Sequence, residues 1–177
     1  DVTVRLVRTP QAVHTLLALR QTRSVLTANA SYRQAADHEL EEYTGELSEV
    51  VGGAYGDAQG DRFKQLWQGY VTDLSAYANG AASQDASAKQ DARAGLMAYC
   101  DDYGAWLARA SNGQVQAGDA ARTARTRVQG LIKQVDAYAT RDYDQAYKIE
   151  RQAYQTTFTA GATLAKASSH EAILADF

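Results

Sequence analysis

One group of residues in this chain has the types and the spacing that a metal ion needs. His38 is followed by Glu41 and Glu42, and offsets of three and four residues place side chains on adjacent turns of a helix. Imidazole nitrogens and carboxylate oxygens both bind zinc and iron. Residues 37–49 hold six carboxylates in all, however, and such a run is also typical of a solvated helix face. A metal site and a solvent-facing surface are therefore the two interpretations of this stretch.

Tyrosine is the second unusual feature, with 11 copies against three Phe and two Trp. A tyrosine buries its ring but still needs a partner for its hydroxyl. A group of tyrosines therefore either forms core with hydroxyls at the boundary or lines a ligand-binding surface. Our candidate ligand-binding residues lie along one stripe of the last expected helix: Tyr143, Tyr147, Glu150, Arg151 and Tyr154.

The patterns of common catalytic and cofactor sites are missing from the sequence. A di-iron bundle needs Glu three residues before His, but Gln11, Ala35 and Ala167 stand at those places. There is no G-x-S-x-G, no phosphate-binding loop and no dinucleotide fingerprint. The lone Cys100 forms neither an internal disulfide nor a thiolate zinc site. We therefore expect no enzymatic activity and no cofactor, and a helical enzyme with a dispersed site is the alternative.

Composition narrows the class of protein further. The 177 residues carry a formal net charge of −3, which argues against a nucleic-acid binder, since those are usually basic. No apolar run approaches the roughly 18 residues that a membrane helix needs. A partner, if there is one, is a protein or a small molecule, and the sequence leaves the oligomeric state open.

The elements that must position these residues are helices. Apolar residues repeat with a helical period almost throughout, which predicts an all-α, antiparallel bundle of about six helices. We expect an extended segment at 1–9 and a single helical-bundle domain at 10–177. Helices are expected near 10–28, 31–56 and 61–79, after a loop at 80–87 through an inner face at 92–110, after a second loop at 111–119 to about 138, and from 142 onward. Gly56 and Gly80 are expected to end helices, and Asp119 and Asp142 to begin them.

A weak internal repeat accompanies this pattern. Residues 74–78 match residues 135–139 at an offset of 61, so units near 57–110 and 119–167 are two copies of a helical hairpin on this interpretation. Chance agreement in an alanine-rich chain is the alternative. Glycines inside the expected helices suggest close helix approach: Gly45, Gly52, Gly53, Gly69, Gly95, Gly130 and Gly161.

Charge is spread unevenly along the chain. Residues 1–36 carry five Arg and one Asp, a net charge of +4, while residues 37–61 carry eight carboxylates and no Lys or Arg, a net charge of −8. One interpretation is that the first helix lies beside the second, with ion pairs at the rim of their contact. The other is an acidic docking surface for a basic partner or a cation.

Short motifs in residues 50–167 carry a family resemblance. They are Tyr55-Gly56 followed by Gly60, Leu66-Trp67, and later Asp142-Tyr143 and Ala146-Tyr147, with Arg151 and Tyr154 beyond. This pattern resembles a largely uncharacterised family of extracytoplasmic helical proteins of Gram-positive bacteria, secreted or lipid-anchored, some with a copper-amine-oxidase-like domain. The resemblance implies an exported protein without its leader, with the cytoplasm as the alternative, and it implies no activity.

The resemblance also bears on metal binding. Family members often carry histidines at places that here hold Tyr70, Gln155 and either Leu19 or Arg20, so ligands of that kind are not carried over. The leading hypothesis is a non-enzymatic, extracytoplasmic bundle that binds a partner or a small ligand. The alternative is a metal-binding or metal-dependent protein that uses His38 and the neighbouring carboxylates.

Overall fold

A computed structural model describes residues 17–152 of the chain. The expected extended segment at 1–9, the start of the first helix, Tyr154, Gly161 and the end of the expected repeat lie outside this range. Within it, four complete helices follow one another: α2 (Ala30–Tyr55), α3 (Asp57–Ser83), α4 (Ala86–Ala110) and α5 (Ala117–Ala139). Helical segments at 17–26 and 143–152 flank them, and no strand occurs between residues 17 and 152. The prediction of an all-α antiparallel bundle is confirmed.

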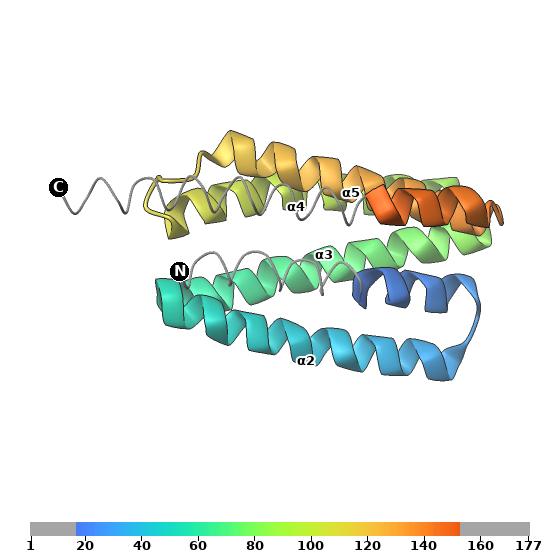
Figure 1. The fold of residues 1–177 in the computed structure, drawn as a ribbon, viewed down its shortest axis with the longest axis horizontal. Coiled ribbons are helices and arrows are strands. Elements are labelled where there is room, and N and C mark those ends of the chain that lie inside the picture. The colour runs from blue at the N-terminus through green and yellow to red at the C-terminus, as the bar shows by residue number, and fades with distance from the viewer. Residues whose placement is uncertain (1–16, 153–177) are drawn as a thin grey trace.

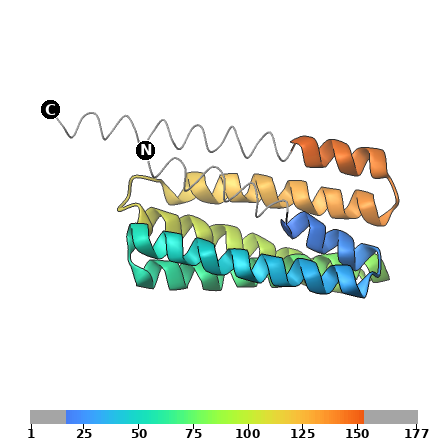
Figure 2. The same cartoon turned by 60° about the horizontal axis from the view of Figure 1, so that its bottom comes forward.

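The helices pack mainly against their neighbours in sequence. α3 contacts both α2 and α4, α4 contacts α5, and α3 also meets α5. Consecutive helices run in opposite directions along one long axis (Figure 1). The segments 17–26 and 143–152 lie at the same end of the bundle, the first beside α2 and the second beside α5 (Figure 2). α3 and α5 point the same way, as two copies of a hairpin would, but the repeat itself stays a prediction.

Short polar side chains start three of the helical stretches. Asn29 accepts a hydrogen bond from the backbone N–H of Tyr32 at 2.9 Å, and Asp85 accepts one from Ala88 at 3.0 Å. Asp142 accepts from the N–H of Gln145 at 3.1 Å, as the sequence predicts. Each bond satisfies a donor that the first turn of a helix leaves free.

Three predicted helix boundaries are wrong. α3 begins directly after Gly56 and not near Asp61, because Gly56 makes the junction alone with a φ of 94°. α3 also runs past Gly80 to Ser83, and the left-handed residue that ends it is Gln84, with a φ of 59°. α5 begins at Ala117, which puts Asp119 in its first turn and not at its N-cap.

Close helix approach occurs at glycines, but mostly at others than those expected. A Cβ on Gly104 of α4 would lie 2.4 Å from the carbonyl oxygen of Ala117, and one on Gly60 of α3 would lie 2.6 Å from that of Ser48. Of the expected glycines between residues 17 and 152, only Gly95 has an atom nearer than 3 Å to a built Cβ. Gly45, Gly53, Gly69 and Gly130 have nothing within 4 Å of a built Cβ.

The core follows the axis of α3, α4 and α5. Its fully buried aliphatic side chains include Leu74, Leu96, Leu131 and Val128, and α2 contributes Leu40. No helix in the described range is long and apolar enough to cross a membrane.

Candidate functional site

The candidate site lies at the end of the bundle where the two flanking segments meet. The guanidinium of Arg23, from segment 17–26, forms an ion pair with the carboxylate of Glu150 from segment 143–152. Its central carbon lies 5.0 Å from the ring centre of Tyr147 and 5.6 Å from that of Tyr138, which belongs to α5. Gln134, also in α5, donates to the Glu150 carboxylate at 3.4 Å. We call these five residues the Arg23 cluster.

The Arg23 cluster is half-buried, and some of its polar atoms are not satisfied. The side chains of Arg23 and Glu150 are 19% and 21% exposed, so their attraction is screened less than that of a surface pair. Gln134 is only 3% exposed. Its Oε1 and the Nε of Arg23 are both buried and find no hydrogen-bond partner among the described residues. A buried polar atom without a partner costs free energy, so this cluster is not optimised for stability alone.

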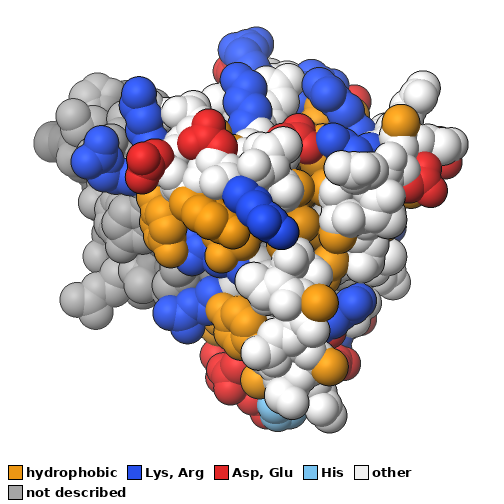
Figure 3. Space-filling model, turned by 90° about the vertical axis from the view of Figure 1, so that its right-hand side faces the viewer, with side chains coloured by type: hydrophobic (Ala, Val, Ile, Leu, Met, Phe, Trp, Pro, Cys, Tyr) orange, Lys and Arg blue, Asp and Glu red, His pale blue; other side chains and the backbone are white. Residues whose placement is uncertain are grey.

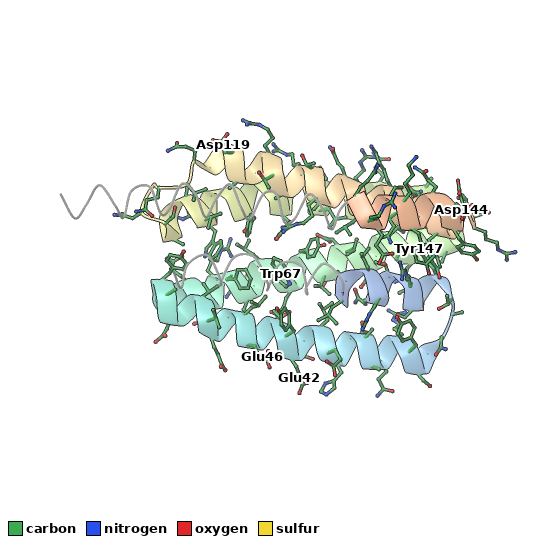
Figure 4. All side chains as sticks on the ribbon, viewed as in Figure 1. Glu42, Glu46, Trp67, Asp119, Asp144 and Tyr147 are labelled. Carbon is green, nitrogen blue, oxygen red and sulfur yellow. The ribbon has the colours of Figure 1, made fainter. Side chains whose placement is uncertain are left out.

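Two exposed tyrosines cover the outside of the cluster. Tyr147 is 57% exposed and Tyr143 is 47% exposed, the highest values among the exposed large hydrophobic side chains. The ring of Tyr143 meets that of Tyr138 edge-on, with centres 5.1 Å apart. Figure 4 shows Tyr147 at this end of the bundle, and Figure 3, which faces the same end, shows hydrophobic side chains gathered among Lys and Arg.

The structure thus joins part of the predicted ligand-binding set. Tyr147 and Glu150 lie together in the Arg23 cluster, and Tyr143 reaches its edge through Tyr138. Arg151 is exposed and takes no part in the cluster, and Tyr154 lies outside the described residues.

Sequence reasoning missed Arg23, Gln134 and Tyr138 as members of this site. Arg23 lies 127 residues before its partner Glu150, and nothing in the local spacing connects them. A usable signal was present, because residues 20–24 (RQTRS) place five polar residues between the apolar residues 17–19 and 25–26. Three of these, Gln21, Thr22 and Ser24, are buried at 6%, 2% and 1% exposure.

Other tyrosines form core and not a site. An aromatic row runs between α3 and α4, with ring centres of successive members 4.9–5.8 Å apart: Phe63, Trp67, Tyr70, Tyr99, Tyr103 and Trp106. Burial raises the pKa of Tyr70 to about 12 and that of Tyr99 well above its usual value. These phenols therefore stay neutral at physiological pH, and they offer no base for catalysis.

A second polar cluster joins α3, α4 and α5 around Asp136. The carboxylate of Asp136 accepts from the hydroxyl of Tyr77 at 3.0 Å and from the ammonium of Lys89 at 2.7 Å. The Lys89 nitrogen also lies 5.2 Å from the ring centre of Tyr77. The hydrogen bond to Asp136 raises the pKa of Lys89. All three side chains satisfy one another, which indicates a structural role.

The predicted metal residues lie on the outer surface of α2. His38 Nε2 and Glu42 Oε1 are 3.7 Å apart, with both side chains more than 60% exposed, and Glu41 is exposed as well. Figure 4 shows Glu42 and Glu46 pointing away from the bundle. Between residues 17 and 152, no group of three or more His, Cys, Asp or Glu is arranged to hold a metal ion. Metal binding at this place stays a prediction without support from the geometry.

The uneven charge has a specific arrangement in space. Segment 17–26 lies beside α2, and Gln21 donates to Asp37 of α2 at 2.8 Å. Arg23, however, turns away from the acidic helix to Glu150, while Arg33 lies 3.8 Å from Asp37 in its own helix. The carboxylates of α2 beyond Asp37 therefore stay largely exposed to solvent.

Comparison of the chain with protein-family models, with curated proteins and with solved structures finds no match.

Proposed function

We propose that this chain is a non-enzymatic helical bundle that binds a protein partner or a small ligand at the tyrosine-covered end. The observation that carries the proposal is the placement of Tyr147, which is 57% exposed although its ring is held over the Arg23 guanidinium. An aromatic ring that is both exposed and fixed loses little conformational freedom on binding. Tyrosine and arginine are also the residue types that contribute most at protein interfaces.

The surroundings of Tyr147 add to this support. Tyr143 lies one turn earlier on the same helix and is fixed by its edge-on contact with Tyr138. Aromatic side chains on adjacent turns share one face of the helix, and Figure 3 shows hydrophobic side chains among lysine and arginine at this end of the bundle. An apolar centre with a polar rim is the usual composition of a binding surface.

The exported location and the family resemblance belong to the same proposal. Both rest on the motifs around Trp67 and Tyr143, and a binding protein outside the cytoplasm is consistent with an absence of catalytic motifs. Fractionation of the native host tests the location, because a chain recovered only from the cytoplasm would overturn that part of the proposal.

Native mass spectrometry tests the binding. The wild-type chain is purified from its own host without chelator, and the same sample is analysed for metals. We expect a stoichiometric organic or protein mass on the wild type. Tyr147→Ala is expected to lose this mass, and Tyr32→Ala is expected to keep it. Tyr32 is the matched control because it is an exposed tyrosine, at 39%, on a different helix.

Three results would overturn the proposal. They are a wild-type protein without bound mass, a bound mass that survives Tyr147→Ala, and stoichiometric zinc, copper or iron without any organic mass. The last result would favour the metal hypothesis and direct attention to His38. Circular dichroism of each variant shows whether the helical fold is intact, since a loss of binding through unfolding carries no information about the site.

A further inference from the structure

The Arg23 cluster has the composition of a receptor for a cation. Two tyrosine rings face the guanidinium carbon at 5.0 and 5.6 Å, within the distance at which the quadrupole of an aromatic ring attracts a positive charge. The Glu150 carboxylate supplies the opposite charge. A planar guanidinium suits these groups better than a compact ammonium, because it stacks on rings and binds carboxylates through a rigid fork of N–H groups.

Arg23 and the four residues that surround its guanidinium come from different parts of the chain. Tyr138 and Gln134 lie on α5, and Tyr147 and Glu150 lie on the next helical segment, so these four residues come from neighbouring elements. Arg23 comes from segment 17–26, which is 127 residues away from Glu150 in sequence. The four surrounding residues are therefore placed by neighbouring elements, and Arg23 reaches them from a distant part of the chain.

Two details show that Arg23 fills this site incompletely. Its Nε is buried without a hydrogen-bond partner among the described residues, and so is the Oε1 of Gln134 beside it. Gln134 is 3% exposed, so this acceptor cannot turn to bulk water. The opening, in contrast, is accessible, because Tyr147 is 57% exposed and the side chains of Arg23 and Glu150 are each about one-fifth exposed.

We infer that Gln134, Tyr138, Tyr147 and Glu150 form a guanidinium-binding cage that Arg23 occupies within the chain and that an arginine side chain of a protein partner takes over. The inference rests on the proposed function, since it names the chemistry of the partner for the same surface. A tethered ligand acts as if present at roughly millimolar concentration. Arg23 therefore excludes weak competitors, and only a partner with further contacts displaces it.

Removal of Arg23 tests the cage directly. Arg23→Ala is titrated with N-ethylguanidine, which replaces the deleted group, and with N-ethylurea, its neutral counterpart. We expect a saturable rise of the melting temperature with the guanidine, by roughly 3–5 °C at ten times its dissociation constant. We expect no such rise with the urea, with wild-type protein, or with Arg20→Ala, which removes a neighbouring exposed arginine. Glu150→Gln added to Arg23→Ala is expected to abolish the response.

If Arg23→Ala does not fold in buffer, N-ethylguanidine must restore its helical circular dichroism and N-ethylurea must not. A folded Arg23→Ala that responds no differently from wild type overturns the inference, and so does an unfolded one that the guanidine does not restore. The partner is tested on the same variant with N-acetyl-arginine amide against N-acetyl-citrulline amide. Binding of the arginine compound alone supports the inference. Binding of N-ethylguanidine without binding of the arginine compound shows a purely internal contact and overturns it.

The two proposals fail separately. A wild-type protein that carries no ligand from its host, together with an Arg23→Ala variant that binds the guanidine, removes the proposed function and leaves the cage. A bound natural ligand that depends on Tyr147, together with an unresponsive Arg23→Ala, leaves the proposed function and removes the cage.

Discussion

Replacing Gly104 by alanine is expected to destabilise the protein, although alanine is the better helix former. The added Cβ would lie 2.4 Å from the carbonyl oxygen of Ala117 and 2.9 Å from both the backbone nitrogen and the Cβ of Ala121. Contacts with backbone cannot be relieved by rotating a side chain, so α4 and α5 must move apart at this crossing. Overpacking of this kind costs about 1–3 kcal/mol, and contacts this short place Gly104→Ala near the upper end.

The helix propensity of alanine offsets about 1 kcal/mol of that cost, which leaves a net loss of about 2 kcal/mol. For a chain of this size the melting temperature should fall by roughly 4–8 °C. Gly130→Ala is the matched control, because Gly130 is also inside a helix and has nothing within 4 Å of a built Cβ. It should gain up to about 1 kcal/mol. Thermal and urea unfolding followed by circular dichroism measure both variants, and a Gly104→Ala protein as stable as Gly130→Ala would refute the reasoning.

Three further predictions concern buried polar groups. Tyr77→Phe should lose about 1 kcal/mol of unfolding free energy, because the Tyr77 hydroxyl donates to Asp136. Tyr99→Phe should be neutral or stabilising, because the buried Tyr99 hydroxyl finds no partner in the described range. Urea unfolding that ranks the two variants the other way contradicts this. Burial raises the pKa of Cys100 from 9.0 to about 11, so at pH 8 the thiolate fraction in the native protein is about a hundredfold lower than that of an ordinary exposed cysteine. Ellman's reagent should therefore react with Cys100 only after unfolding. Burial also raises the pKa of Asp73 above 3.8, so ionisation disfavours the folded state and stability falls as pH rises through that pKa. Asp73→Asn should therefore melt at a higher temperature than wild type at pH 7 but at the same temperature below about pH 3, and an equal difference at both pH values would argue against this cause.

Helix number and direction were predictable from sequence because apolar periodicity reports which face of each helix is buried. The N-cap at Asp142 was also predictable, since a short acceptor side chain before a helix satisfies a local donor. Gly80 misled the prediction, because its lack of a side chain serves packing against Lys89 and not helix termination. Local sequence cannot separate these two uses of glycine, since only the neighbouring helix decides between them.

The candidate site was predictable only in part, for a related reason. Tyr147 and Glu150 lie one turn apart on the same helix, so their proximity follows from spacing alone. Their partner Arg23 depends on how the first and last helical segments of the described range pack, which no short-range pattern contains. The run of polar residues at 20–24 marks the place as unusual but does not identify what it contacts.

The ion pair between Arg23 and Glu150 can also form only after all the other described helices have been made. α2 to α5 are connected by short turns, so each hairpin closes from nearby contacts as it leaves the ribosome. Arg23 must wait for the 127 residues that separate it from Glu150, which at about 5–20 residues per second takes roughly 6–25 s. During that interval Gln21 can already reach Asp37 of α2, but Arg23 lacks its carboxylate partner and the rings of Tyr138 and Tyr147. Segment 17–26 is therefore made before the other described helices but completes its contacts only with the last of them.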